Sequence, residues 1–363
     1  MVVRYSTSLF PRDKGLILLI NVAGEFKMKP FNIIPFLLTL FVMSCDNNEG
    51  VVGLNEESFS SQFTFVACEG NYGSSNGSVS VIDEYGSVSS ITDIGDVVQS
   101  LEVYDDKLFV IVNNSHLIKI YQITEEGLSM PGIEISTEGS SPREMVVFDN
   151  KVYFTNWNTQ DVKVLNLFNY NIEASIPVGV MPEDIVMDDG YLYVANSGES
   201  TVSKIELSSY NVNLIDVGEG PTSLSLSNDN LYISRTFYDT QWNPFYGTSK
   251  LDIISLDSQI NNYGAGIACG GSVVSVGSEV YRSFDGGIAP IDSNLDIIST
   301  EKIGNYNPSH VYNVEVFNNF IWFCLTDHDS VNQIKILDFN GSEIQSYDVG
   351  IAPGDIATWQ KTY

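Results

Sequence analysis

The strongest constraint on the fold of this chain is a short unit that recurs seven times between Gly95 and the C-terminus. Each copy begins with a glycine, and the clearest copies continue as Gly-x-x-Pro. The seven glycines are Gly95, Gly139, Gly179, Gly218, Gly266, Gly304 and Gly350, at spacings of 38 to 48 residues. A repeat of this length is typical of the blades of a β-propeller and differs from the shorter repeats of helical or leucine-rich solenoids.

Within each unit the residues follow a strand pattern. Short apolar runs of period 2 alternate with turns that are rich in Asp and Asn, which is typical of half-buried antiparallel strands. One lysine falls at the same place in the third run of five units: Lys119, Lys163, Lys204, Lys250 and Lys335. The repeating glycine and proline suit the connections between strands, because glycine permits unusual backbone angles and proline cannot donate to a ladder. The pattern predicts four antiparallel strands in each unit.

The two ends of the repeated region complement each other. Residues 63–94 contain only the second, third and fourth strands of a unit, and residues 353–359 contain only a first strand. Together they make a seventh blade, which removes the open edges of the array. We therefore predict an all-β, monomeric, seven-bladed propeller of four-stranded antiparallel blades, with the ring closed by the N-terminal strands and a C-terminal strand.

The N-terminal region carries a targeting signal. An apolar run from Phe31 to Met43 follows Lys29 and ends just before Cys45, an order typical of a signal peptide, and its last residues resemble a bacterial lipobox. The interpretation is a leader over residues 1–44 with translation starting at Met28, a lipidated tether over 45–58 that begins at acylated Cys45, and a propeller over 59–363. The alternative is a cleaved signal followed by an incidental cysteine.

The net charge of the chain limits its possible binding partners, and its cysteine positions bear on disulfides and metal binding. The chain has a formal net charge of −29 at pH 7. Such a surface repels phosphate backbones and anionic headgroups, so we expect no nucleic-acid partner and membrane attachment through the lipid alone. Beyond Cys45 only Cys68, Cys269 and Cys324 remain, and their scatter predicts small buried residues rather than disulfides or metal ligands.

The candidate binding residues lie in the predicted loops of one face. If the first strand of each blade is innermost, the fourth-to-first and second-to-third connections share that face, where propellers usually bind ligands. Aromatic, amide and scarce basic side chains gather there, most densely in an aromatic loop over residues 236–248. The predicted ligand-binding residues are Tyr72, Asn113, Arg143, Trp157, Asn196, Arg235, Phe237, Tyr238, Trp242, Tyr246, Tyr306 and His328. The alternative is that they are solvated or only cover the rim.

Catalytic and metal-binding motifs are weak in this sequence. It contains no His-Glu-x-x-His and no phosphate-binding glycine loop. The run Asp327-His328-Asp329 has no fourth ligand at a supporting distance along the chain and is interpreted as a polar turn. We therefore predict a protein that is not an enzyme and that has no resident metal or cofactor.

Two segments resemble known families. Tyr153–Asn156 and Tyr193–Asn196, with the Gly-x-x-Pro units, resemble the YVTN or YncE-like surface-layer propeller repeat, which implies the propeller fold over about residues 63–359. The segment 67–78 resembles lipoprotein propellers of the outer membrane that work beside TonB-dependent transporters, including the cobalamin-binding BtuG type. This segment differs from the usual sequence of those lipoproteins, because Cys68 stands where they have Asn. This resemblance implies a surface-exposed lipoprotein that captures a corrinoid and delivers it to a TonB-dependent transporter.

Two other functions remain open from the sequence. The rim could bind a protein or a glycan and no small molecule. The protein could also be a lactonase-like propeller enzyme, which would need a proton-shuttling group beside an arginine at the centre of the ring. His310 and Arg143 are the residues available for that role.

Overall fold

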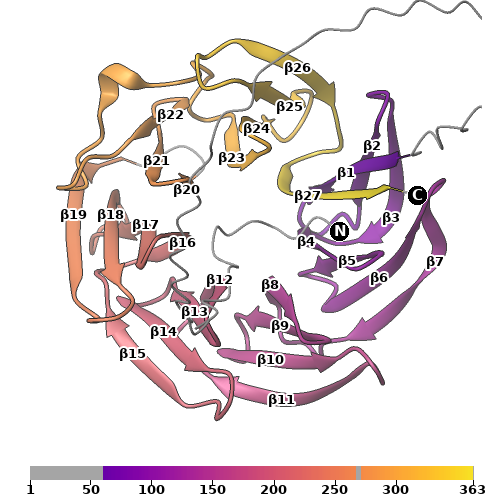
Figure 1. Cartoon of the computed structure of the whole chain (residues 1–363), viewed down its shortest axis with the longest axis horizontal. Coiled ribbons are helices and arrows are strands. Elements are labelled where there is room, and N and C mark those ends of the chain that lie inside the picture. Colours follow the sequence, from indigo (N-terminus) through magenta and orange to yellow (C-terminus); the bar gives the residue numbers. More distant parts are fainter. Residues whose placement is uncertain (1–59, 267–270, 363) are drawn as a thin grey trace, which may run out of the picture. The chain divides into compact units, whose positions relative to one another are not determined.

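The computed structural model describes residues 60–266 and 271–362, which form seven antiparallel sheets arranged as blades around a central axis (Figure 1). Six sheets have four strands and one has three. The first strand of each blade lies nearest the axis in Figure 1. The predicted seven-bladed, all-β propeller is therefore confirmed.

The strands of each blade follow in order from the axis outward. Blade 1 contains β27 (Pro353–Thr362), β1 (Ser60–Cys68), β2 (Gly77–Asp83) and β3 (Val88–Gly95). Blade 2 contains β4 (Val98–Tyr104), β5 (Lys107–Val112), β6 (Leu117–Thr124) and β7 (Gly127–Ser136). Blade 3 contains β8 (Pro142–Phe148), β9 (Lys151–Asn156), β10 (Asp161–Asn166) and β11 (Asn171–Pro177). Blade 4 contains β12 (Pro182–Asp188), β13 (Tyr191–Asn196), β14 (Thr201–Glu206) and β15 (Val212–Asp216).

The remaining three blades continue the ring. Blade 5 contains β16 (Pro221–Ser227), β17 (Asn230–Tyr238), β18 (Pro244–Asp252) and β19 (Ser258–Ala265). Blade 6 contains β20 (Val273–Val276), β21 (Glu279–Phe284) and β22 (Gly287–Pro290), followed by the 3-10 helix η1 (Ser299–Glu301). Blade 7 contains β23 (Val311–Phe317), β24 (Phe320–Thr326), β25 (Asn332–Leu337) and β26 (Glu343–Asp348). In blade 6 an isolated bridge between Ile288 and Ile303 stands where the other blades have a fourth strand.

The ring is closed by pairing of the two ends of the described chain, as predicted. Strand β27 pairs with β1, and Trp359 lies opposite Phe63. The Trp359 side chain is fully buried and stacks on Phe63, with ring centroids 5.8 Å apart. Its Nε1 donates to Asp106 of blade 2 at 3.1 Å, and Lys361 forms an ion pair with the same carboxylate. The clasp therefore joins the C-terminal strand to the N-terminal strands of blade 1 and to the β4–β5 turn of blade 2.

The repeat also ties neighbouring blades through their innermost strands. Two residues after the repeating proline, Asp184 accepts a hydrogen bond from the backbone N–H of Leu224 in the next blade at 2.7 Å. Asp355 does the same for the N–H of Leu101 at 2.7 Å. Apolar side chains of adjacent blades then pack face to face around these links, in separate clusters around the ring. Because these carboxylates hold the inner strands in register, the residue between proline and aspartate is held near the axis.

The aromatic segment 236–248 is not the loop that the sequence predicted. Strands β17 and β18 extend through it as a hairpin, with Phe237 paired to Phe245 and a turn over residues 239–243. The two phenyl rings stack with centroids 5.8 Å apart. Aromatic residues have high strand propensity and stabilise one another across strands, so they lengthen the hairpin instead of covering the rim irregularly.

Among the residues that the structure describes, no helix is long and apolar enough to cross a membrane. The lipid-anchor prediction falls on residues 1–59, which lie outside the described ranges, as does Cys269. Cys68 and Cys324 are buried and carry free thiols, as predicted.

Candidate functional site

The strand order defines two faces of the ring. The connections that join a fourth strand to the next first strand, and a second strand to a third, lie at the same end, which we call the loop face. The first-to-second and third-to-fourth turns lie at the other end, which we call the turn face. This agrees with the arrangement assumed in placing the candidate residues.

At the loop face, polar side chains from five blades meet near the axis in what we call the axial cluster. Its members are Glu69, Gln99, Arg143, Trp157, Glu183 and Tyr312. Four of them occupy the second position of an innermost strand, directly after the residue at which the repeat enters the sheet. Glu69 follows β1, and Trp157 follows β9. Most of the cluster is therefore built by equivalent positions of the repeat in different blades.

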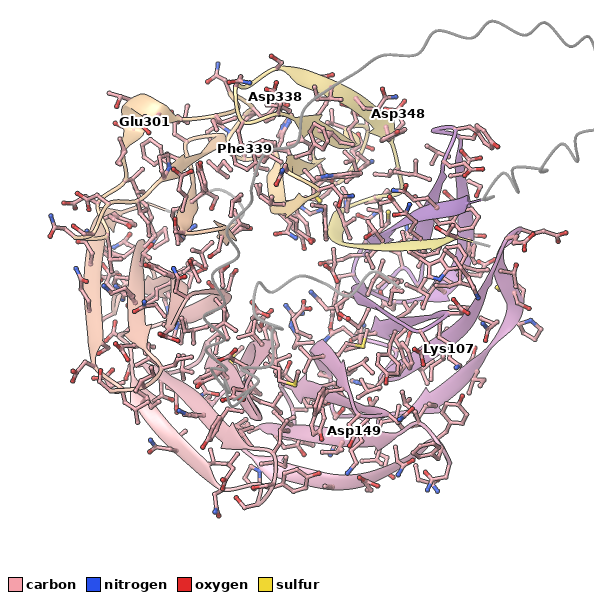
Figure 2. The ribbon with its side chains drawn as sticks, in the orientation of Figure 1. Lys107, Asp149, Glu301, Asp338, Phe339 and Asp348 are labelled. Carbon is pink, nitrogen blue, oxygen red and sulfur yellow. The ribbon has the colours of Figure 1, made fainter. Side chains whose placement is uncertain are left out.

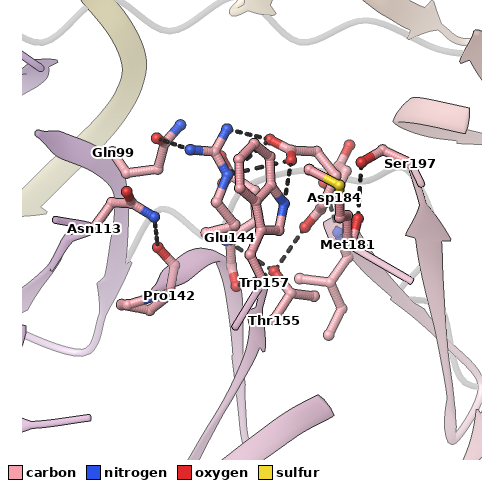
Figure 3. Close-up of polar contacts among 12 residues, drawn as sticks. Gln99, Asn113, Pro142, Glu144, Thr155, Trp157, Met181, Asp184 and Ser197 are labelled. Carbon is pink, nitrogen blue, oxygen red and sulfur yellow. Dashed lines mark hydrogen bonds and ion pairs between the residues drawn. The ribbon is translucent and has the colours of Figure 1, made fainter. Parts of the chain in front are cut away.

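Arg143 and Glu183 form the centre of the cluster, and Figure 3 labels Gln99 and Trp157, which are hydrogen-bonded to Arg143 and Glu183 respectively. Arg143 Nε lies 3.1 and 3.2 Å from the two carboxylate oxygens of Glu183, and Nη2 lies 2.5 Å from Oε1. Arg143 Nη1 donates to Gln99 Oε1 at 2.6 Å. Each side chain of the ion pair is 17% exposed. Burial lowers the pKa of Arg143, but the charge and hydrogen bonds of Glu183, together with the charges of Glu144 and Glu69, outweigh it and raise the pKa above its ordinary value, so the guanidinium stays charged.

Trp157 closes this pair from one side. The guanidinium carbon of Arg143 lies 4.2 Å from the centroid of the indole ring, a cation–π contact, and Trp157 Nε1 donates to Glu183 Oε2 at 2.8 Å. The donors of Arg143 thus face a carboxylate, an amide oxygen and an aromatic ring. A bidentate pair with these additional partners is rigid, because each member fixes the orientation of the others.

Glu69 and Tyr312 form the second half of the cluster. Burial raises the pKa of Glu69, and the Glu183 charge adds to this effect; the hydrogen bond from Tyr312 and the charge of Arg143 oppose it. Burial also raises the pKa of Tyr312, so its hydroxyl remains a donor to Glu69. Gly354 makes room for the carboxyl group, since a Cβ at this position would lie 3.1 Å from Glu69 Oε1.

The structure brings three of the predicted residues together. Arg143 and Trp157 belong to the axial cluster, and the His328 ring packs edge-on against Tyr312 with centroids 5.6 Å apart. Sequence reasoning missed Glu69, Gln99, Glu183 and Tyr312. The signal that could have found three of these four is their shared repeat position, because Gln99, Glu183 and Tyr312 align with Arg143 at the start of an innermost strand.

Three other predicted residues are enclosed in the scaffold. Asn113 is buried and donates to the carbonyl of Pro142 at 2.8 Å. Asn196 is fully buried and donates to two hydroxyls of the next strand. Arg235 is 1% exposed, and its Nη2 donates to the carbonyl of Asn261 at 2.9 Å. At the ends of second strands, these side chains satisfy backbone and hydroxyl groups of the loops, which explains why polar residues occur there.

The predicted aromatic residues divide into packed and exposed groups. Phe237 stacks within its hairpin, and Tyr246 packs against Tyr263 with centroids 5.2 Å apart. Tyr306 packs edge-on against Phe323 of blade 7. The side chains left in solvent are Tyr72, Tyr238 and Trp242. Of these, Tyr238 and Trp242 contact each other at the tip of the β17–β18 hairpin, with centroids 6.1 Å apart.

The Asp327-His328-Asp329 segment is a polar turn, as predicted. Asp327 Oδ1 accepts hydrogen bonds from the backbone N–H groups of Asp329, Ser330 and Val331. These bonds lower the pKa of Asp327 to about 2. Within residues 60–266 and 271–362, no three His, Cys, Asp or Glu side chains gather in a way that could hold a metal ion.

The fold and the axial cluster define a seven-bladed β-propeller protein. No family model matches the chain, and no curated protein matches it. Solved structures match it along most of its length. A Bacteroides uniformis protein with a proposed 6-phosphogluconolactonase activity has a TM-score of 0.61 at 15% identity, covering 82% of this chain and 99% of that chain.

Two further solved structures illustrate how wide the structural similarity is. Streptogramin B lyase has a TM-score of 0.53 at 12% identity, covering 73% of this chain and 95% of the lyase chain. Apo AztD from Citrobacter koseri has a TM-score of 0.52 at 12% identity, covering 83% of this chain and 98% of AztD. At these identities the similarity shows the propeller fold alone, and function has to be argued from the site.

Proposed function

We propose that this protein is a non-enzymatic binding protein that captures a large, uncharged polar ligand at the loop face, over the axial cluster. The observation that supports this proposal is the convergence of polar and aromatic side chains from five blades on one point near the axis. A rigid surface that combines polar and aromatic side chains can fix the orientation of a bound ligand. A corrinoid, whose macrocycle is fringed with amides, is the specific ligand that we propose.

The charge balance of the cluster favours an uncharged ligand. Arg143 is flanked by two carboxyl groups, Glu69 and Glu183, and each of its three nitrogens already donates to a protein oxygen. An anionic ligand would have to displace a carboxylate and approach a chain of net charge −29. A ligand with amide groups can instead exchange hydrogen bonds with carboxylate, amide and phenol groups without this penalty.

The topology also fits the proposed anchoring of the protein. Ser60 and Thr362 pair with each other at the turn face, because β1 ends, and β27 begins, at the loop face. The described chain therefore begins and ends at the turn face, at the opposite end of the strands from the axial cluster. In the proposal, the protein is an outer-membrane lipoprotein that is lipidated at Cys45 and exposed at the cell surface, and its loop face presents the ligand to a TonB-dependent transporter.

The test is a titration of the purified protein with cyanocobalamin, followed by calorimetry and by co-elution of the red chromophore. We expect one-to-one binding that weakens at least about tenfold in Trp157→Ala, since base-like and macrocyclic ligands lose a stacking and hydrogen-bonding partner. Phe168→Ala is the control, because Phe168 is exposed on the turn face. An absence of heat and of co-elution at high micromolar concentrations would end the corrinoid proposal, and equal losses in both variants would exclude the axial site.

A lactone-hydrolysing enzyme is the second candidate, and one observation favours it. Glu69 is a half-buried carboxyl with a raised pKa in the field of Arg143, which is a common arrangement for a general acid or base. The predicted proton shuttle, His310, precedes β23. Release of acid from simple lactones, abolished by Glu69→Gln, would replace the binding proposal with this one. If neither ligand nor activity is found, the exposed pair Tyr238 and Trp242 makes a protein or glycan partner the next hypothesis to test.

A further inference from the structure

A concave site lies on the turn face, between blades 3 and 4. A groove of about 440 Å³ opens there, lined by the β8–β9 turn, the β12–β13 turn and the β14–β15 turn. Figure 2 labels Asp149, which belongs to this lining. Because these turns are at the opposite end of the strands from the axial cluster, the groove is independent of the proposed function.

The inner wall of the groove is aromatic. Tyr153 is almost fully buried, Tyr191 and Tyr210 are half-buried, and Phe148 at the end of β8 is 41% exposed. Tyr210 forms side-chain hydrogen bonds with both Tyr153 and Lys151, so these three side chains fix one another's positions. Phe148 is the one exposed residue of β8; the other residues of this strand are buried or half-buried.

The charges that line the groove are predominantly negative. The only cation of the lining, Lys151, is paired with Glu173 at 2.6 Å. Asp149 and Asp189 stand exposed on equivalent turns of the two blades, and Glu206 lies on the third side. A ligand that enters therefore meets aromatic side chains and carboxylates, and the one cation among the lining residues is already paired.

We propose that this groove binds an organic ammonium group. Aromatic faces attract ammonium ions through the ring quadrupole, and nearby carboxylates add a Coulombic attraction that is stronger in a concave site than on an open surface. One face of Tyr191 already carries the ammonium of Lys204, 4.3 Å from the ring centroid. The rings that contact the ligand are therefore those of Phe148 and Tyr210, with the carboxylates of Asp149 and Asp189 completing the site.

The test compares tetramethylammonium with 3,3-dimethylbutan-1-ol, an uncharged molecule of the same shape. Binding is measured by saturation-transfer NMR on the full chain at constant ionic strength. We expect saturable binding of the cation at millimolar concentrations and little of the alcohol. The affinity for the cation should fall about threefold or more in Phe148→Ala and in the double variant Asp149→Asn/Asp189→Asn, as expected for loss of a cation–π or paired-charge contact.

A matched control separates the groove from the general charge of the protein. Asp105 and Asp229 occupy the equivalent turns of blades 2 and 5, so Asp105→Asn/Asp229→Asn removes the same charge from the same face. The proposal requires this variant to bind like the parent protein. An equal loss in both double variants, equal binding of the alcohol, or no saturable binding of the cation would each overturn it. Thermal unfolding midpoints confirm that all variants are folded.

Discussion

The Arg143–Glu183 pair gives a quantitative test of how rigid the axial cluster is. We predict the coupling energy of the two side chains in a double-mutant cycle built from Arg143→Met, Glu183→Ala and the double variant. Exposed ion pairs contribute about 0.2–1 kcal/mol, and breaking a fully buried pair costs about 3–5 kcal/mol. At 17% exposure for each side chain and with three contacts of 2.5 to 3.2 Å, the pair lies between these limits. We expect a coupling of about 2 kcal/mol.

The single variant Glu183→Ala should cost more than the coupling alone. It also leaves Trp157 Nε1 without its acceptor, and an unsatisfied buried donor costs about 1–3 kcal/mol. We therefore expect a total loss of about 3 kcal/mol in the free energy of unfolding. The same variant releases the guanidinium of Arg143 from its carboxylate, so inorganic phosphate should bind to the variant and not to the parent protein.

Urea denaturation, followed by fluorescence and circular dichroism, measures the cycle. The slope of unfolding free energy against urea concentration should be equal in all four proteins, which shows that the compactness of the states is unchanged. The pair Lys335–Glu343, at 3.1 Å but with side chains 21% and 47% exposed, is the control and should give less than about 1 kcal/mol. A coupling below about 0.5 kcal/mol for Arg143–Glu183 would show that the axial cluster behaves as ordinary solvated surface and would refute the reasoning.

Three further predictions concern other parts of the ring. Burial raises the pKa of Glu69 above its ordinary value of 4.5, so its contribution to stability is full below that pH and is lost as the pH rises through the folded-state pKa. The thermal unfolding midpoint should therefore depend less on pH between pH 4.5 and 7 in Glu69→Gln than in the parent protein, and parallel pH profiles of the two proteins would contradict this. Trp359→Ala, which empties a buried site against Phe63, should cost about 3–5 kcal/mol in urea unfolding, and a loss below 1 kcal/mol would mean that the ring is not held by this clasp. Burial raises the pKa of the Cys68 and Cys324 thiols, so neither should react with a thiol reagent until the protein unfolds; fast labelling of the folded protein would contradict their placement.

The architecture could be predicted from the sequence because its signals are local. The repeating glycine, proline and aspartate each satisfy a requirement within a few residues: a turn, a strand entry, or a hydrogen bond to the next blade, as Asp184 and Asp355 show. The β17–β18 hairpin was misassigned as a loop for the opposite reason. Its aromatic residues are compatible with a packed loop and with a strand, and only their pairing with residues of the opposite strand shows that they form a hairpin.

The candidate site was predicted less completely because its members are common residue types. Arg143 and Trp157 were found since basic and indole side chains are scarce in this chain. Glu69 and Glu183 are two of 46 acidic residues, and no local pattern distinguishes them from solvated carboxylates. Asn196 shows the converse error, because an amide in a loop position turned out to be fully buried and bonded to the next strand.

The position after the repeating proline explains how a nearly symmetric ring acquires a one-sided site. Blade 3 and blade 4 place Arg143 and Glu183 there, whereas the same position holds Thr222 in blade 5 and Gly354 in blade 1. In blades 1 and 4 this residue lies between a proline and an aspartate that accepts a hydrogen bond from the next blade, so it can vary without disturbing the sheet. Polar contacts are thus concentrated on one side of the axis, and a ligand bound there would be contacted by protein along one edge of the ligand. Variation at this position, more than any change in the blades, is therefore what should set the ligand that a propeller of this kind selects.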